Sequence, residues 1–234
     1  MNKSFQALCA RLQAAGVPDA RFDAAQLYRF VTGRDPRLDD GPDEEEARRL
    51  EELAVRRAAR EPLQYLLGEW DFLDFTLKVG PGVLCPRADS EVVCETAAEL
   101  LQGKQAPVVL DLCAGTGCLG LGVARACPGA QVTCVEKSEA AWPYLVENTA
   151  GTGVRTVQAD VFCWYRTLAP ESVDLIISNP PYLTGEEMES LMPETAHEPA
   201  LALDGGTDGL DFYRLFTEHY AVVLRPGGWL VLEI

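Results

Sequence analysis

The stretch that decides the fold reads Val108-Val109-Leu110-Asp111-Leu112-Cys113-Ala114-Gly115-Thr116-Gly117. Its first half is an apolar run interrupted only by Asp111, which is typical of a strand buried on both faces of a sheet. Its second half indicates a tight turn, because Gly115 and Gly117 can adopt backbone conformations that other residues avoid. Residues 118–126 then predict a helix. The whole stretch therefore has the strand–turn–helix order of a ligand-binding βα unit.

Outward from this unit, the chain alternates between apolar strands and helices. Strands are predicted at 131–136, 154–158, 173–178 and 229–234, and further helices at 90–101, 139–149 and 209–223. Repeated βα units with continuous apolar strands imply an α/β fold with a parallel, doubly wound, Rossmann-like sheet. The sequence stops within the last predicted strand, so we expect it to be truncated.

The residues before this sheet predict two further parts. Apolar side chains recur at helical spacing near the start, as at Phe5, Leu8 and Leu12, and indicate a small helical bundle at 1–68. Aromatic and aliphatic residues around a Leu73-Asp74 turn predict a β-hairpin linker at 69–82. The predicted α/β domain occupies 83–234.

Composition and charge narrow the class of protein. The formal net charge of −16, from 20 Lys and Arg against 36 Asp and Glu, argues against a mainly electrostatic grip on nucleic acid. No apolar stretch is long enough to cross a bilayer, and the N-terminus lacks the apolar core of a signal peptide. The eight cysteines form no Cys-x-x-Cys pair, which argues against a zinc site or a disulfide framework. We expect a cytoplasmic monomer without a metal, a membrane or a direct nucleic-acid partner.

The glycine turn and the strand after it predict a cofactor site. Glu136 ends that strand, where a carboxylate can accept hydrogen bonds from both hydroxyls of a ribose. The Gly-x-Gly-x-x-Gly fingerprint is incomplete, which favours S-adenosylmethionine (SAM) over NAD but leaves both open. Asp111 can lie near the methionine end of SAM, and Asp160 can either accept from the adenine amino group or cap a helix. The predicted cofactor-binding residues are Asp111, Cys113, Ala114, Gly115, Thr116, Gly117, Glu136, Asp160, Val161 and Asn179.

A second motif, Asn179-Pro180-Pro181-Tyr182, follows directly after the apolar strand 173–178. The two prolines remove two backbone donors and stiffen the loop, and they push the preceding asparagine toward an extended conformation. Acceptor oxygens beside an aromatic face suit a planar NH2 group. A rigid turn without chemistry is the alternative, but a position above a parallel sheet favours a ligand site.

Together, these motifs resemble those of the PrmC/HemK family, the N5-glutamine methyltransferases of peptide chain release factors. The resemblance covers essentially the whole chain. Besides the two motifs above, it is carried by Leu12-x-x-Ala15-Gly16, Arg60–Gly68, Leu84–Glu91, Glu198-Pro199 and Leu203–Leu210. It implies a SAM-dependent methyltransferase domain that here lacks its last antiparallel strands. It also implies that the helical domain docks the substrate protein, a release factor.

The resemblance and the chemistry of the acceptor predict the catalytic residues Asn179, Pro180, Pro181 and Tyr182. By hypothesis, Asn179 Oδ1 and the Pro180 carbonyl accept hydrogen bonds from the glutamine amide while Tyr182 packs on it. Motifs of the same type serve N6-adenine methyltransferases, so adenine in DNA or RNA remains an alternative substrate. The sequence also leaves open a glutamine methyltransferase of a ribosomal protein and a non-catalytic SAM-binding protein.

Overall fold

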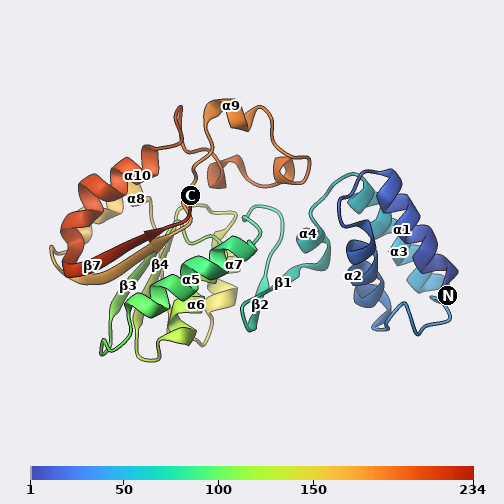
Figure 1. Ribbon diagram of the computed structural model, residues 1–234, viewed down its shortest axis with the longest axis horizontal. Coiled ribbons are helices and arrows are strands. Elements are labelled where there is room, and N and C mark those ends of the chain that lie inside the picture. The colour runs from blue at the N-terminus through green and yellow to red at the C-terminus, as the bar shows by residue number, and fades with distance from the viewer. Residues whose placement is uncertain (1) are drawn as a thin grey trace. The chain divides into compact units, whose positions relative to one another are not determined.

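The computed structural model describes residues 2–234, and its contacts divide the chain into two compact units. The helical unit comprises Met1–Gly68 together with the later segment Met192–His197. The sheet unit comprises Glu69–Leu191 and Glu198–Ile234. Figure 1 traces the chain through both units. The hairpin thus belongs to the sheet unit, and the predicted boundaries do not anticipate that residues 192–197 belong to the helical unit.

The helical unit contains α1 (Lys3–Ala14), α2 (Ala20–Thr32), α3 (Glu44–Ala58), α4 (Leu63–Leu67) and a 3₁₀ turn (Thr195–His197). Apolar side chains at the predicted spacing form its core: Phe5, Leu8, Leu12, Ala24, Leu27 and Tyr28. Helix α3 begins where Asp43 accepts a hydrogen bond from the Glu46 N–H and the Glu46 side chain accepts one from the Asp43 N–H. Periodic burial and capping therefore account for these helices locally.

A cluster of ion pairs holds segment 192–197 within the helical unit. Arg57 is 5% exposed and donates to Asp23 at 2.6 Å and to Glu194 at 2.8 Å. Arg60 donates to both carboxylate oxygens of Glu194 at 2.6 Å. Burial alone would raise the pKa of Glu194, but the Arg60 and Arg57 donors outweigh it and lower that pKa to about 2. The segment is thus attached by charge-assisted bonds.

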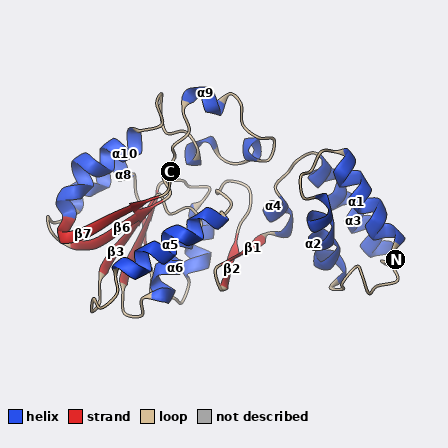
Figure 2. Cartoon of the chain, viewed as in Figure 1, coloured by secondary structure: helices blue, strands red, loops and turns tan. Residues whose placement is uncertain are grey.

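The sheet unit is built on five parallel strands in the order β5-β4-β3-β6-β7. The strands are β3 (Val108–Leu112), β4 (Gln131–Glu136), β5 (Arg155–Gln158), β6 (Val173–Ser178) and β7 (Leu224–Leu232), and a separate hairpin pairs β1 (Glu69–Phe72) with β2 (Phe75–Lys78). The helices are α5 (Ala88–Leu100), α6 (Cys118–Ala126), α7 (Trp142–Thr149), α8 (Val161–Trp164), α9 (Gly185–Met188) and α10 (Asp211–Leu215), with 3₁₀ turns at Tyr165–Thr167 and Ala200–Ala202. The alternation of strands and helices confirms the predicted Rossmann-like α/β fold (Figure 2).

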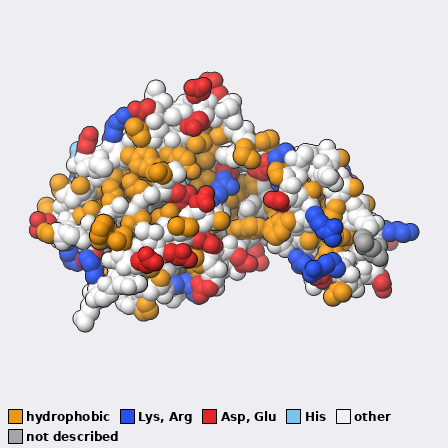
Figure 3. Space-filling view, viewed as in Figure 1, with side chains coloured by type: hydrophobic (Ala, Val, Ile, Leu, Met, Phe, Trp, Pro, Cys, Tyr) orange, Lys and Arg blue, Asp and Glu red, His pale blue; other side chains and the backbone are white. Residues whose placement is uncertain are grey.

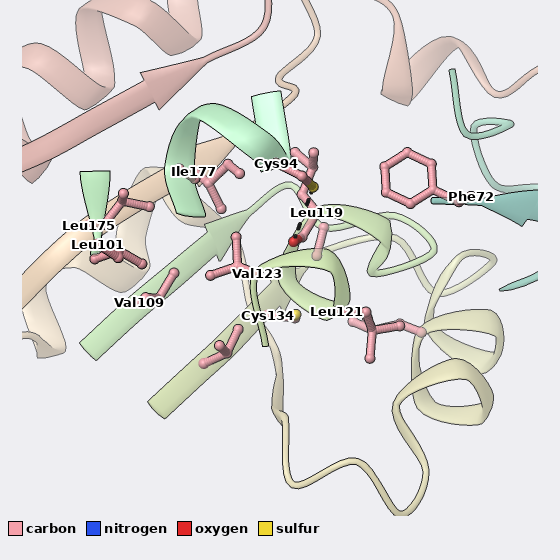
Figure 4. Packing of buried hydrophobic residues seen from close by; sticks show 14 of the residues in the cluster. Phe72, Cys94, Leu101, Val109, Leu119, Leu121, Val123, Cys134, Leu175 and Ile177 are labelled. Atoms are coloured by element: carbon pink, nitrogen blue, oxygen red, sulfur yellow. Dashed lines mark hydrogen bonds between the residues drawn. The ribbon is translucent and has the colours of Figure 1, made fainter. Parts of the chain in front are cut away.

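One apolar cluster packs the sheet against α5 and α6. Figure 4 shows Val109 and Leu175 of the sheet near Leu101 at the end of α5, and Cys94 of α5 beside Leu119 of α6. The Cys94 thiol donates to the Leu119 carbonyl at 3.6 Å. A Cβ on Gly120 would lie 2.4 Å from Cys134 Sγ, so only glycine lets α6 approach β4 this closely. A second cluster joins Phe216 and Tyr220 to sheet residues such as Leu110 and Ile176, which are not in the first cluster. Because both faces are covered, the strands need the continuous apolar sequence that predicted them.

Two predicted elements differ in detail from the structure. The helix predicted at 209–223 begins as α10 at Asp211, continues as a π-helix over Phe216–Tyr220 and ends as a 3₁₀ turn over Ala221–Val223. The strand predicted at 229–234 begins earlier, at Leu224, and its pairing with β6 is irregular between Val173 and Leu175. The π-helix carries Phe216 and Tyr220, which lie in the same apolar cluster as sheet residues.

Candidate active site

A cavity in the sheet unit opens at the carboxyl ends of β3, β4, β5 and β6. It holds about 940 Å³ of empty space, including its open mouth. Of the predicted site residues, the following line it: Cys113, Ala114, Gly115, Thr116, Glu136, Asp160, Val161, Asn179 and Pro181. The other predicted residues, Asp111, Gly117, Pro180 and Tyr182, lie outside its wall. A crevice at the carboxyl ends of parallel strands is where open α/β sheets bind their ligands.

The β3–α6 turn is shaped by a run of unusual backbone angles. The φ values are +60° at Cys113, +54° at Gly115 and +82° at Gly117. A Cβ on Gly117 would lie 2.7 Å from Leu145 Cδ1, so this position requires glycine for space as well as for conformation. The Ala114 N–H donates to the Val135 carbonyl at 3.0 Å, which ties the turn to β4. The turn therefore presents backbone to the cavity in a fixed shape.

Glu136 lies at the end of β4 with its carboxylate held from two sides. One oxygen accepts from the Gly115 N–H at 2.8 Å, and the other accepts from the Ser138 N–H at 2.6 Å. These bonds fix the carboxylate at the cavity wall and leave lone pairs on both oxygens. A ribose offers two adjacent hydroxyl donors, and a carboxylate held in this way suits them.

Asp160 follows β5 and caps the short helix α8. Its carboxylate accepts from the Phe162 N–H at 3.0 Å and pairs with Lys137 at 2.8 Å. Burial alone would raise the pKa of Asp160, but these two donors outweigh it and lower the pKa. The capping role considered from the sequence is therefore present. Asp160 and the buried Val161 also line the cavity, so a role toward an adenine ring stays a prediction.

Asp111 is fully buried beneath the glycine turn. One carboxylate oxygen accepts from the Gly120 N–H at 2.8 Å, and the other, Oδ1, has no hydrogen-bond partner among the described residues. Burial raises the pKa of Asp111 to about 7, although the Gly120 N–H opposes this shift. The Asp111 carboxylate therefore holds the start of α6. Asp111 does not line the cavity, so its contact with the methionine end of a cofactor stays a prediction.

The Asn-Pro-Pro-Tyr motif follows directly after β6, at the carboxyl end of the sheet. Asn179 Nδ2 donates to Glu233 Oε1 at 2.7 Å, and Ser90 Oγ lies 3.5 Å from the same nitrogen. Within residues 2–234, no donor is bonded to Asn179 Oδ1, so this acceptor stays available. Pro180 and Pro181 are buried. Their packing fixes the backbone on which the asparagine stands.

The loop that contains Leu203 and Gly205 packs against the end of the Asn-Pro-Pro-Tyr motif. The Leu183 N–H donates to the Leu203 carbonyl, and the Gly205 N–H donates back to the Leu183 carbonyl, each at 2.9 Å. A Cβ on Gly205 would lie 2.7 Å from Tyr182 Cα, so the loop can approach this closely only with glycine there. The Tyr182 side chain remains 37% exposed, and burial of the rest raises the pKa of its hydroxyl.

Two carboxylates near the cavity were not found by sequence reasoning as site residues. Glu233 bonds Asn179, although the two residues are 54 positions apart along the chain. Glu198 is 6% exposed and accepts from the Cys85 N–H at 3.1 Å and from Arg87 at 2.5 Å, which fixes a segment of the cavity wall. Glu198 appeared in the sequence only as part of a family resemblance. Glu233 carried no local signal, because its partners come from other elements.

The charged and apolar groups that line the cavity fit a cofactor such as SAM better than a dinucleotide. Among the described lining residues, Lys137 is the one cation, and its ammonium is paired with Asp160. A pyrophosphate would therefore meet carboxylates without a free positive partner. A cationic sulfonium and a neutral nucleoside are compatible with Glu136, Asp160 and the apolar walls.

Comparison with protein families gives two matches on this chain. The family model described as "PrmC N-terminal domain" matches residues 5–68, and that described as "Methyltransferase small domain" matches residues 76–205. A solved T. thermophilus 16S rRNA N2 G1207 methyltransferase, in complex with AdoMet and guanosine, is 30% identical over 50% of this chain and 33% of that chain, with a TM-score of 0.41.

Curated relatives align with nearly the whole chain. A "Release factor glutamine methyltransferase" from Geobacter sulfurreducens is 39% identical, covering 95% of this chain and 80% of the relative. One of the same name from Mycolicibacterium smegmatis is 42% identical, covering 100% of this chain and 84% of the relative. Identity of this extent, together with both domain matches, shows that the chain belongs to the release factor glutamine methyltransferase family.

Proposed function

We propose that this protein transfers a methyl group from SAM to the side-chain amide nitrogen of a glutamine in a peptide chain release factor. The observation that carries the proposal is the position of Asn179, which shares one cavity wall with the glycine turn and Glu136. A methyl donor bound at the turn and an amide bound at Asn179 would therefore meet in one space. Membership of the family supports glutamine over adenine as the acceptor.

The proposed chemistry addresses a weak nucleophile. The lone pair of an amide nitrogen is delocalised into its carbonyl. Asn179 Oδ1 and the Pro180 carbonyl accept hydrogen bonds from the two N–H groups, which hold the nitrogen in line with the methyl group and favour a localised lone pair. SAM supplies the methyl group on a cationic sulfur. A nitrogen–carbon bond forms as the carbon–sulfur bond breaks with its electrons going to sulfur, and the methylated amide releases a proton to water.

The other residues of the cavity are proposed to bind and orient the cofactor. Glu136 would accept from the ribose hydroxyls, and the part of the turn that lines the cavity, from Cys113 to Thr116, would pack its backbone against the methionine part. Asp160 and Val161 border the adenine ring.

The proposal includes the helical unit as the part that docks the release factor. Every residue proposed for the chemistry comes from the sheet unit of one chain, which is consistent with a monomer. On the visible face of the sheet unit, Lys and Arg side chains are scattered among carboxylates (Figure 3), and this supports a protein substrate over nucleic acid. No helix within residues 2–234 is long and apolar enough to span a membrane. We place the reaction in the cytoplasm, where release factors act.

The test is to incubate the protein with methyl-labelled SAM and, in separate reactions, a release factor, a ribosomal protein fraction and DNA. We expect label on the release factor alone, on one glutamine located by peptide mass spectrometry. A release factor with that glutamine changed to alanine is the matched control and should stay unlabelled. Label on DNA adenine or only on a ribosomal protein would overturn the proposed substrate. Absence of label on every acceptor, with SAM bound, would favour a non-catalytic protein.

A further inference from the structure

Glu233 is a buried carboxylate that reaches the acceptor motif from a different strand. It follows β7 directly, is 7% exposed, and its N–H donates to the Ser178 carbonyl at 3.0 Å. That backbone bond fixes Glu233 beside the end of β6. Its side chain then bonds Asn179 Nδ2 through Oε1 at 2.7 Å and the Ser90 hydroxyl through Oε2 at 2.5 Å.

An ionised carboxylate has consequences for how the neighbouring amide is oriented. A carboxylate only accepts hydrogen bonds, whereas the asparagine amide has a donating NH2 group and an accepting oxygen. Glu233 therefore bonds stably only to Nδ2, and Asn179 Oδ1 must point the other way. Without Glu233 the amide could rotate by half a turn and present its NH2 group to an incoming NH2 group, which would repel it.

We infer that Glu233 is a positioning residue for the proposed methyl transfer, on which this role depends. By holding Nδ2, it aims Asn179 Oδ1 at the N–H of the acceptor. Ser90 fixes the second oxygen of Glu233 and so holds the carboxylate in one orientation. Ser90 lies in the first turn of the 13-residue helix α5, where the helix dipole favours negative charge.

The ionisation of Glu233 gives this role a signature in pH. Burial raises the pKa of Glu233, and Asp89 raises it further, while Ser90, Arg87 and Asn179 oppose the shift. The hydroxyls of Tyr182 and Tyr213 also face it from the loop after β6 and from α10, and the Tyr213 hydroxyl donates to the Glu233 carbonyl at 2.8 Å. Protonated Glu233 can donate to Asn179 Oδ1, so Asn179 is oriented for the acceptor amide only above this raised pKa.

The experiment compares two variants with opposite expectations. Glu233→Met removes both acceptors, and we expect kcat to fall about 100-fold, as for other lost orienting hydrogen bonds, with SAM affinity within about 2-fold. Its melting temperature should be unchanged or higher, because a buried carboxylate is replaced by an apolar side chain of similar size. Glu233→Gln keeps an amide oxygen that can accept from Asn179, so kcat should fall only about 10-fold and lose its acid limb.

The matched control is Asp174→Asn, at the opposite end of the same sheet. Asp174 is also 7% exposed but lies away from the cavity, so this variant should lose stability and keep kcat. If Glu233→Met keeps kcat within about 3-fold, or loses SAM binding and stability together, the positioning role is wrong.

A second measurement does not depend on which acceptor is used. In proton–nitrogen NMR spectra, the side-chain NH2 signals of Asn179, assigned with Asn179→Ala, should shift with pH in the wild type and not in Glu233→Gln. Unshifted signals in the wild type would overturn the inference. If the wild type methylates adenine instead of glutamine, the proposed substrate fails, but the kcat loss in Glu233→Met is still expected.

Discussion

The two ends of strand β6 hold equally buried carboxylates in opposite electrostatic settings. Asp174 near its start and Glu233 beside its end are each 7% exposed. Asp174 accepts from the Val108 N–H at 2.9 Å, from Lys104 at 3.0 Å and from Arg225. Among residues 2–234, the donors bonded to the Glu233 carboxylate are the neutral groups of Ser90 and Asn179. Asp174 is therefore bonded to two cations, whereas Glu233 is bonded to none and only feels the charge of Arg87.

The balance between burial and bonded partners decides how each group titrates. Burial alone would raise the pKa of Asp174, but the Val108 N–H and the Lys104 and Arg225 cations outweigh it and lower that pKa. For Glu233 the burial effect wins, and its pKa is raised. At the amino end of the sheet, the charge of Asp174 thus stabilises the fold. At the carboxyl end, the charge of Glu233 destabilises the fold but orients Asn179.

The largest effect should come from the carboxyl end. Asn179→Ala removes the proposed acceptor oxygen, and we expect kcat to fall about 100- to 1,000-fold, as for the loss of one orienting hydrogen-bond partner at a reacting centre. SAM binding should change little, and the free energy of unfolding should fall by about 1 kcal/mol because Glu233 Oε1 loses its donor. Calorimetric SAM titration, urea unfolding and single-turnover methylation measure the three quantities. Methyl transfer that survives within a few-fold would refute the proposed hydrogen bond from the glutamine amide to Asn179 Oδ1.

The next effect should come from the amino end and concern stability alone. Asp174→Ala leaves Lys104, Arg225 and the Val108 N–H without their shared acceptor. We expect a loss of about 2 kcal/mol in the free energy of unfolding, reduced because both cations are partly exposed. Urea unfolding measures it, with kcat per folded molecule as the control. If kcat per folded molecule also falls, the proposal that the Asp174 end serves stability alone is wrong.

A third carboxylate, Asp111 on the adjacent strand, extends the comparison to pH. Its pKa is raised to about 7, above the unfolded value, so its contribution to stability is present at low pH and is lost as pH rises through 7. Asp111→Asn cannot ionise and should remove this loss, gaining about 1–2 kcal/mol relative to wild type between pH 5 and pH 8. Unfolding curves at both pH values test it. Parallel pH profiles for the two proteins would show that Asp111 does not titrate in this range.

The smallest effect should follow from removing one of the cations that pair with Asp174. Lys104→Met removes one of its three donors, and we expect a loss of about 0.5–1 kcal/mol because the pair is partly exposed. The lowered pKa of Asp174 means that its stabilisation is present at neutral pH and is lost as pH falls through that pKa. The difference between wild type and variant should therefore shrink below pH 4. A constant difference down to pH 2 would assign the loss to packing of the lysine stem.

Local sequence predicted most of the fold because the signals were local. The apolar run of β6, the glycines of the β3–α6 turn and the heptad-like spacing of α1 each act within a few residues. The cavity residues at the strand ends were predictable for the same reason, since parallel strands bring their carboxyl ends to one edge. The irregular helix over 211–223 was not predicted in type, and its buried residues Phe216 and Tyr220 lie in the same apolar cluster as sheet residues.

The sequence by itself determined the parallel α/β architecture, the helical first part, the glycine turn with Glu136 and the Asn-Pro-Pro-Tyr motif, because each is encoded by neighbouring residues. Only the tertiary structure decided that residues 192–197 belong to the helical unit and that Asp111 turns into the core. It also decided which buried carboxylate meets cations and which meets Asn179. Those outcomes depend on side chains far apart in the chain, whose pKa values and orientations exist only once folding has chosen their partners.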